Sequence, residues 1–353
     1  MFFSICIPQY NRTKFLIEAL HSLQQQTCTD FEVCISDGGS TDGGLPIIED
    51  FLKNSGLKYK IRSSKKNLQY DPNLRESIAL SEGRFIFLMG NDDALSGPDV
   101  LMMLKQLLLK NEPVAVAITN YFELSSGQLF RRMQATQMLG GGPDVVANTF
   151  RHYSFVSGII MDGGAARNAA TDRCDGSEMY QMYLGARLVA ASGNFLAIDD
   201  VCINKDIQIV DEVVDSYRNK SDYRYCKVMM RPLPMGRILE TVAYGIDCAT
   251  SGAGRNNAIA SVAKQLYQYT YPFWIFEYRR VQSFNYSLGV YLALAPSRIA
   301  KKVNMQQFAY YKVWWLYVVV GVVGFCTPIW FFDRLKPWLY TLAKRGRTAV
   351  GTH

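Results

Sequence analysis

The chain has 353 residues, of which 49% are hydrophobic and 20% are charged, so it can bury a core and is not a disordered protein. Its eight cysteines are scattered without a Cys-x-x-Cys pair, which argues against a zinc site and for reduced thiols in a cytosolic compartment. The three histidines are too dispersed to form a histidine metal cluster.

The net charge of +7 is unevenly distributed along the chain. From Ala263 onward there are 12 Lys or Arg and two acids, whereas the residues before it carry 26 basic and 29 acidic side chains. All five tryptophans also lie after Ala263. Basic, Trp-rich segments are typical of membrane–water interfaces, so we expect a near-neutral body followed by a cationic, aromatic region.

Apolar runs of strand length alternate with amphipathic stretches through the first part of the chain. Strands are expected at 2–7, 31–36, 57–62, 85–89 and 114–119, and helices at 13–26, 45–54, 72–81 and 100–110. This alternation predicts βαβ units and a mostly parallel sheet. Further along, residues 120–133 are expected to form a hairpin, and a helix is expected to run from an N-cap at Ser177 to Ala191.

The most informative stretch is residues 84–93, Arg-Phe-Ile-Phe-Leu-Met-Gly-Asn-Asp-Asp. Its apolar part predicts a buried strand, and Asn91, Asp92 and Asp93 follow the carboxyl end, where open α/β sheets bind ligands. Burying unpaired carboxylates is costly, so packing alone explains them poorly. Hard oxygen ligands suit Mg²⁺ or Mn²⁺ bound to phosphates. The alternative is an acidic loop that caps the next helix.

Two other polar segments are candidate parts of a site. Asp37 follows the second strand and begins a Gly-rich stretch that matches neither the dinucleotide fingerprint nor the P-loop, so it is either a ligand-binding loop or a flexible turn. Asp175 and Glu178 lie in a dense polar segment. If Ser177 caps a helix, Glu178 falls in its first turn, where it is a general base or simply stabilises the helix.

Taken together, these motifs resemble the family 2 glycosyltransferases, which have the GT-A fold. The matching positions are Pro8, Tyr10, Asn11 and Arg12, then Ser36–Asp42, then Asn67, Asp71, Asn73, Ala79, Gly83 and Asn91–Asp93, in the family's order and spacing. A narrower resemblance, through Gly90–Asp93 and Gly176–Gln181, is to the O-antigen (lipopolysaccharide) branch and to abequosyltransferases in particular.

The resemblance implies a nucleotide-sugar donor, Mn²⁺ or Mg²⁺, and an acceptor hydroxyl, with inversion at the anomeric carbon. It assigns roles to the matching residues: base and ribose to Pro8, Tyr10, Asp37 and Asp71, ribose or donor sugar to Asp92, metal to Asp93 and Asn91, and general base to Glu178 with Asp175 in reserve. The family's metal motif usually begins with Asp, so Asn91 offers less charge. The processive signature Gln-x-x-Arg-Trp is not visible, which favours addition of a single sugar, with CDP-abequose as the donor implied by the narrower resemblance.

We expect three regions: a GT-A domain at 1–210, a connecting helical segment at 211–262 and a basic, Trp-rich helical region at 263–353 that associates with the membrane. Residues 313–332 carry no charge and are long enough to span a bilayer of about 30 Å. Gly321, Gly324 and Pro328 interrupt them, and basic residues flank both ends, so attachment to the membrane surface is favoured over a single span or a soluble helix pair.

The expected partners follow from this arrangement. A basic aromatic region beside a sugar-transfer site suggests a polyprenyl-diphosphate-linked oligosaccharide acceptor and membrane lipid, at the cytoplasmic face of the bacterial inner membrane. Nucleic acid is not expected, because no binding motif accompanies the basic residues. Two alternatives stay open. A nucleotidyltransferase would need more cations near the first strand than Arg12 and Lys14, and a degenerate membrane-bound scaffold would explain Asn91.

Overall fold

The computed structural model describes residues 1–210, 212, 237–281, 283–303, 305–335 and 338. The strands are β1 (Phe3–Gln9), β2 (Phe31–Asp37), β3 (Tyr59–Ser63), β4 (Phe85–Leu88), β5 (Ala94–Leu95), β6 (Val116–Glu123), β7 (Gln128–Phe130), β8 (Gln137–Met138), β9 (Ile159–Asp162) and β10 (Phe195–Lys205). The helices are α1 (Thr13–Gln24), α2 (Leu45–Asn54), α3 (Tyr70–Ala79), α4 (Val100–Lys110), α5 (Pro143–Thr149), α6 (Gly163–Asn168), α7 (Tyr180–Ala190), α8 (Ile238–Ala249), α9 (Gly252–Gln265), α10 (Tyr271–Val281), α11 (Phe284–Ala293) and α12 (Gln307–Cys326).

The strands form one sheet in the order β3-β2-β1-β4-β9-β6-β10-β5, with β7 paired to β6 and β8 paired to β10. Strands β3, β2, β1 and β4 are parallel, so their carboxyl ends lie along the same edge. β9 is antiparallel to both β4 and β6, and β10 runs parallel to β6. The predicted α/β architecture with a mostly parallel sheet is confirmed in this half of the sheet.

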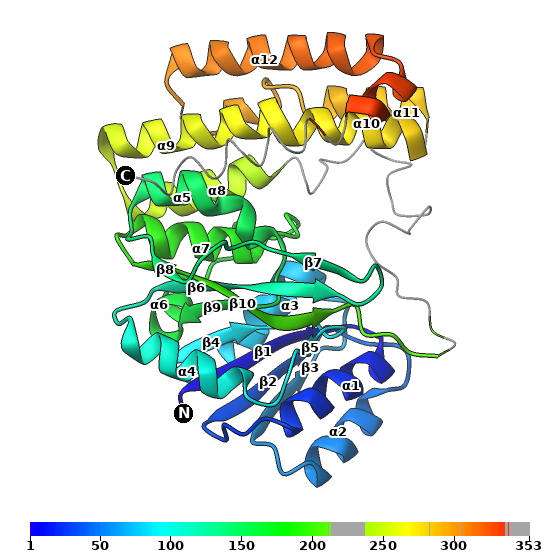
Figure 1. Ribbon diagram of the computed structural model, residues 1–353, viewed down its shortest axis with the longest axis vertical. Helices are drawn as coiled ribbons and strands as arrows, with labels where there is room; N and C mark the ends of the chain where they lie inside the picture. The colour runs from blue at the N-terminus through cyan, green and yellow to red at the C-terminus, as the bar shows by residue number, and fades with distance from the viewer. Residues whose placement is uncertain (211, 213–236, 282, 304, 336–337, 339–353) are drawn as a thin grey trace.

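Helices cover both faces of the sheet and make two apolar cores (Figure 1). One core packs α1 and α4 on the sheet, with Leu16 and Leu104 fully buried. The other begins with α3 and α7 and continues outward without a break through α8, α9 and α12, and its members include Tyr183, Val242 and Val313. The described C-terminal helices therefore share a core with the sheet, and the division into three regions stays a prediction.

The helix expected to start after Ser177 begins later, at Tyr180, and its N-cap is Met179. Glu178 has a left-handed backbone with φ 58°, which is incompatible with a first helical turn. The expectation that Glu178 lies inside that turn was therefore wrong. The physical reason is that a distant carboxylate holds the segment before the helix, as described below.

The uncharged C-terminal stretch also differs from expectation, because α12 runs through Gly321 and Gly324 without interruption. Each glycine lies where a neighbouring side chain comes close: a Cβ at Gly321 would lie 2.2 Å from the Tyr291 hydroxyl, and one at Gly324 would lie 3.0 Å from Ile275. The glycines thus allow close helix packing. The helix ends at Cys326, shortly before Pro328.

Candidate active site

The carboxyl ends of β1, β2 and β4 meet at one edge of the sheet and are joined through Gln9, which no sequence motif singled out. The Gln9 carbonyl accepts hydrogen bonds from the Gly38 N–H at 2.7 Å and from the Asn73 side-chain amide at 2.8 Å. The Gln9 side chain accepts a hydrogen bond from the Asn91 amide at 2.7 Å. Because Gln9 is fully buried, it fixes three strand ends and the start of α3 in one arrangement.

Asp93 lies beneath this edge rather than on its surface, with 2% of the residue exposed. The Ser157 hydroxyl donates to its Oδ2, and the Asp206 N–H donates to its Oδ1 at 3.0 Å. Burial, and after it the charge of Asp92, raise the pKa of Asp93 to about 7. The two carboxylate oxygens therefore link the residues after β4 to the segment before β9 and to the segment after β10.

Asp92 is the more accessible carboxylate of the pair, with 21% of its side chain exposed, and it forms an ion pair with Arg12. Its carbonyl accepts a hydrogen bond from the Ile207 N–H at 2.8 Å, which fixes the backbone next to β10. We expected Asp93 to bind the metal and Asp92 to contact the sugar. Both assignments stay predictions, and Asp92 is the more accessible carboxylate of the two.

Asp37 at the end of β2 is also buried and shapes the Gly-rich loop. Its carboxylate accepts hydrogen bonds from the Ser40 hydroxyl and, at 2.8 Å, from the Ser63 hydroxyl on β3. A buried carboxylate that accepts several hydrogen bonds is held in one orientation. The loop is therefore an ordered turn built on Asp37, and contact of Asp37 with a base or ribose stays a prediction.

The turn after β1 exposes an aromatic side chain beside this loop. Asn11 and Arg12 adopt left-handed backbone conformations, with φ 54° and 59°, and the Asn11 side chain accepts a hydrogen bond from the Thr41 N–H at 2.7 Å. Pro8 is half-buried, whereas Tyr10 is 39% exposed. An exposed aromatic face can stack on a planar ring, and contact of Tyr10 with a base stays a prediction.

Asp71 has a different environment from the one the resemblance implied. Its carboxylate, 1% exposed, accepts hydrogen bonds from the N–H groups of Glu178 at 2.8 Å and Tyr180 at 3.0 Å. Burial raises the pKa of Asp71 despite these bonds. Asp71 therefore caps the start of α7 from α3 and fixes the segment that carries Glu178. Contact of Asp71 with the base and ribose stays a prediction.

Glu178 and Asp175 differ in what surrounds them. The Asp175 carboxylate is bound by both terminal nitrogens of Arg75, with one contact of 3.0 Å, and Arg75 also donates to the Thr171 carbonyl at 2.9 Å. A guanidinium that donates to both carboxylate oxygens holds the side chain in one orientation. Asp175 is therefore a structural ion pair, and Glu178, half-buried, is the better candidate for a general base.

Comparison with known proteins agrees with this geometry. Residues 4–161 match the family model described as Glycosyl transferase family 2. The chain carries a family 2 glycosyltransferase domain. The matched segment contains β1 to β4 and the Asn91–Asp93 edge, so the predicted family is confirmed on the residues that suggested it.

The glycosyltransferase domain has relatives in sequence and in structure. Over 110 residues it is 38% identical to abequosyltransferase RfbV of Salmonella typhimurium, a match that spans 31% of this chain and only a third (33%) of that relative. The crystal structure of TarS 1–349 of S. aureus in complex with UDP superposes with a TM-score of 0.62 at 16% identity, covering 92% of this chain and 91% of that chain. The mannosyltransferase PcManGT of Pyrobaculum calidifontis, in complex with GDP-Man and Mn²⁺, has a TM-score of 0.52 at 11% identity, covering 91% and 86%. These two structures confirm the GT-A fold.

A half-buried arginine lies behind the site of the glycosyltransferase domain, and no sequence pattern pointed to it. Arg132 donates to the carbonyls of Thr119, Phe155 and Ser157 at 2.8, 3.0 and 2.8 Å. Burial lowers the pKa of Arg132 to about 10. Because Ser157 is the donor to Asp93, Arg132 fixes the segment that holds that carboxylate. Only the tertiary contact reveals this role.

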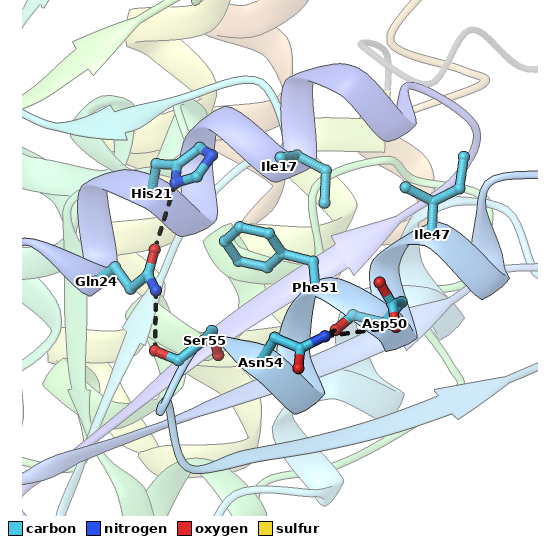
Figure 2. Close-up of a pocket in the computed structure, with 8 residues that line it drawn as sticks. All are labelled: Ile17, His21, Gln24, Ile47, Asp50, Phe51, Asn54 and Ser55. Atoms are coloured by element: carbon cyan, nitrogen blue, oxygen red, sulfur yellow. Dashed lines mark hydrogen bonds between the residues drawn. The ribbon is translucent and has the colours of Figure 1, made fainter.

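A shallow groove of about 410 Å³ lies elsewhere, between α1 and α2 (Figure 2). Its polar side chains bond to their own neighbours: Gln24 donates to the Ser55 carbonyl at 2.9 Å, and Asn54 donates to the Asp50 carbonyl at 2.9 Å. Figure 2 shows that it is lined by helix side chains and not by strand ends. The groove is therefore not the candidate active site.

Proposed function

We propose that the protein transfers one sugar from a nucleotide-sugar donor to an acceptor hydroxyl at the edge formed by β1, β2 and β4. The observation that carries the proposal is that the first part of α3 contacts both the strand ends and the segment of Glu178. Asn73 binds the end of β1 through Gln9, and two residues earlier Asp71 binds the segment of Glu178. One short helix thus fixes a candidate base relative to the strand ends that would hold the donor.

The donor side consists of Tyr10, the loop of Asp37, and the pair Asp92 and Arg12. Tyr10 would stack on the base, while Arg12 and Asp92 lie where a diphosphate and a cation would meet the sheet edge. Because the amide nitrogen of Asn91 is bound to Gln9, its Oδ1 is the atom that it can offer outward. These positions support a nucleotide-sugar donor, and the 38% local identity to an abequosyltransferase supports CDP-abequose as the first candidate.

The residues present fit Mn²⁺ or Mg²⁺ in the kind of atom they offer. Among the described residues no three His, Cys, Asp or Glu side chains gather into a metal cluster, so the protein would contribute few ligands. Asp92 and the Asn91 carbonyl are hard oxygen donors, and such cations commonly take one or two carboxylates together with substrate phosphates. Asp92 and Asn91 would hold the ion, with Asp93 behind them. When bound, the ion would neutralise charge on the departing diphosphate.

Glu178 would accept the proton of the acceptor hydroxyl as its oxygen bonds to the anomeric carbon. The bond from that carbon to the diphosphate oxygen breaks at the same time, and the nucleoside diphosphate leaves with the electron pair. A single carboxylate base on the face opposite the leaving group inverts the anomeric centre. The backbone N–H of Glu178 donates a hydrogen bond to the Asp71 carboxylate, so this contact positions Glu178 through its backbone and not through its side chain.

We further propose a polyprenyl-diphosphate-linked oligosaccharide as the acceptor, at the cytoplasmic face of a bacterial inner membrane. The support is the relationship to an O-antigen type transferase together with the basic, aromatic C-terminal region. A single transfer per acceptor is expected, because no processive signature is visible in the sequence.

The test is calorimetry of the full chain with UDP, CDP, GDP and dTDP, each with and without Mn²⁺, followed by mass spectrometry of lipid-linked acceptor incubated with nucleotide sugars. We expect one diphosphate to bind more tightly with Mn²⁺ and the acceptor to gain one sugar mass. A chain that binds none of these nucleotides is a scaffold. One that binds a nucleoside triphosphate in preference is a nucleotidyltransferase. Either result overturns the proposal.

A further inference from the structure

Helix α12 has one buried and one exposed face, and both are apolar. Val313, Tyr317 and Val320 face the body of the molecule. We call the other face the outer stripe: it consists of Phe308, Tyr311, Trp315, Val318 and Val322, and Trp315 is 69% exposed. These positions recur every three or four residues, so they form a single line along the helix. Figure 1 shows α12 as the outermost layer, on the far side of α9 from the sheet.

A continuous apolar line of this kind needs an apolar partner. From Phe308 to Val322 the helix rises by about 21 Å, and contiguous exposed apolar surface marks a docking site. Helix α11 lies beside it, because the rings of Phe284 and Phe325 are in contact at 5.2 Å. It adds a second exposed line, Phe284, Leu288 and Leu292. Aromatic and branched aliphatic side chains of this composition are enriched where proteins meet lipid.

The charges around the outer stripe favour an anionic lipid surface over a protein partner. The sequence from Tyr278 to Phe332 contains no Asp or Glu. Arg298, Lys301 and Lys312 fall within it and are exposed, whereas the Lys302 ammonium lies 3.8 Å from the Glu240 carboxylate of α8. The Lys312 ammonium lies 4.4 Å from the centre of the Phe308 ring, so a cation sits directly beside the apolar line. Basic residues that border an apolar helix face are the arrangement of surface-bound helices on anionic membranes.

The buried face excludes a helix that crosses the bilayer alone. α12 is by length and composition the one described helix able to span a membrane. However, Tyr317 stacks on Tyr291 at 4.2 Å, and Gly324 lies against Ile275. Arg279 of α10 donates to the Gly324 carbonyl and, at 3.0 Å, to the Thr327 carbonyl, which caps the C-terminal end of α12. A span would have to carry this arginine and the packed helices into lipid.

We propose that α12 lies flat in the surface of an anionic bilayer, with the outer stripe among the acyl chains and Lys301 and Lys312 at the headgroups. The contact is made by one face of the helix while the other stays packed on α9 and α10. The proposal concerns membrane docking by itself. Its value for catalysis rests on the proposed function, since it would hold the transferase at the surface where a lipid-linked acceptor is found.

The test is flotation of the full chain with vesicles of phosphatidylethanolamine and phosphatidylglycerol, compared with phosphatidylcholine vesicles. The double variant Trp315→Gln/Val322→Gln should lower the fraction bound to anionic vesicles by at least about tenfold, because two deeply inserted apolar side chains are lost. The matched control is Ile47→Gln on α2, which is 59% exposed like Val322 and should float as the parent does. The double variant Lys301→Gln/Lys312→Gln should bind anionic vesicles less at low salt.

Three results would overturn the inference. The first is a stripe variant that floats like the parent. The second is a parent that resists extraction by alkaline carbonate, which indicates a span. The third is a parent oligomer that dissociates in the stripe variant while vesicle binding is unchanged, which assigns the stripe to a second copy of the chain. Nucleotide binding measured on the same variants separates this inference from the proposed function. If the parent did not bind a donor nucleotide, the proposed sugar transfer would be contradicted, whereas the inference of membrane docking would still stand.

Discussion

At the scale of single residues, Asp92 and Asp93 are adjacent in sequence and opposite in environment. Asp93 is enclosed and accepts hydrogen bonds from Ser157 and the backbone of Asp206, whereas Asp92 is partly exposed beside Arg12. A carboxylate that already satisfies two protein donors contributes to a bound cation mainly by its charge. The exposed one can contribute its oxygens directly. We therefore propose that Asp92 binds the ligand and that Asp93 supports the site.

We expect Asp92→Asn to weaken Mn²⁺-dependent donor binding by at least about a hundredfold, since it removes the accessible charge from the cation site. Asp93→Asn should change the Mn²⁺ midpoint by less than about tenfold, because Asp93 supports the site from behind. Calorimetric titration of donor nucleotide against Mn²⁺ measures both. If Asp93→Asn abolished the metal dependence and Asp92→Asn kept it, the roles assigned here would have to be exchanged.

Glu178→Gln should leave donor affinity unchanged and lower turnover by about 10²- to 10⁴-fold, because the amide cannot take the acceptor proton. The matched comparison is Asp175→Asn, which should keep turnover within a few-fold of the parent because Asp175 is bound to Arg75. Single-turnover transfer to acceptor reads out both variants. Full activity in the Gln variant would place the base elsewhere.

At the scale of elements, Asp71 shows how one helix positions another. Its carboxylate caps α7 through the N–H groups of Glu178 and Tyr180, a connection between residues more than a hundred positions apart in the chain.

Asp71→Ala should destabilise the fold by about 1–2 kcal/mol, the usual cost of a lost helix cap. It should also lower turnover, because Glu178 loses its anchor. Thermal unfolding measures the loss of stability, and turnover at saturating donor measures the effect on Glu178. If the variant kept the turnover of the parent, Asp71 would not position Glu178.

Glu32 on β2 joins three elements at the opposite end of the sheet. Its carboxylate accepts hydrogen bonds from the Ser4 hydroxyl on β1 and the Glu82 N–H, both at 2.7 Å, and lies 3.0 Å from the Lys60 ammonium. Burial opposes ionisation, but these bonds outweigh it and lower the pKa of Glu32. A lowered pKa in the folded state stabilises the protein above the unfolded pKa. That contribution is lost as the pH falls through the folded value.

Glu32→Gln should therefore cost about 1–3 kcal/mol of stability near neutral pH. The difference from the parent should shrink as the solution is acidified, since the parent carboxylate then becomes protonated too. Urea unfolding across the acidic range measures this. A difference that grows on acidification would mean that Glu32 is not the ionised partner inferred here.

At the scale of the whole molecule, the C-terminal helices belong to the same core as the sheet. Gly245 of α8 is the point of closest approach to α7, because a Cβ there would lie 2.8 Å from the Tyr183 carbonyl and 2.9 Å from the Ala186 side chain. The Tyr183 carbonyl oxygen belongs to the backbone of α7, so it cannot move aside as the end of a flexible side chain could. The position therefore controls how tightly the two helices pack.

Gly245→Val should cost about 1–3 kcal/mol, as overpacked core sites do. It should lower the midpoint of one common thermal transition, because sheet and helices unfold together when they share a core. The control is Gly254→Ala on α9, where the nearest atom to a new Cβ is 3.6 Å away. Two separated transitions in the parent would support the division at residues 210 and 262 that the sequence predicted.

The order of the main strands and helices from β1 to β6, the polar ends of β1, β2 and β4, and the basic aromatic C-terminus could all be derived from sequence by itself, whereas β10 was not predicted. Each of these depends on local periodicity and composition, which neighbouring residues determine. The family resemblance likewise rested on motifs in the first part of the chain, and the matching segment 4–161 confirms it.

Only the tertiary structure decided which carboxylates are buried and which are partly exposed, that Asp71 caps a helix, that Asp175 is bound by Arg75, and that α12 packs along one face. The physical reason is that burial and hydrogen bonding in these segments depend on partners far along the chain. Ser157 and Asp206 determine the environment of Asp93, and Tyr291 and Arg279 determine which side of α12 remains exposed.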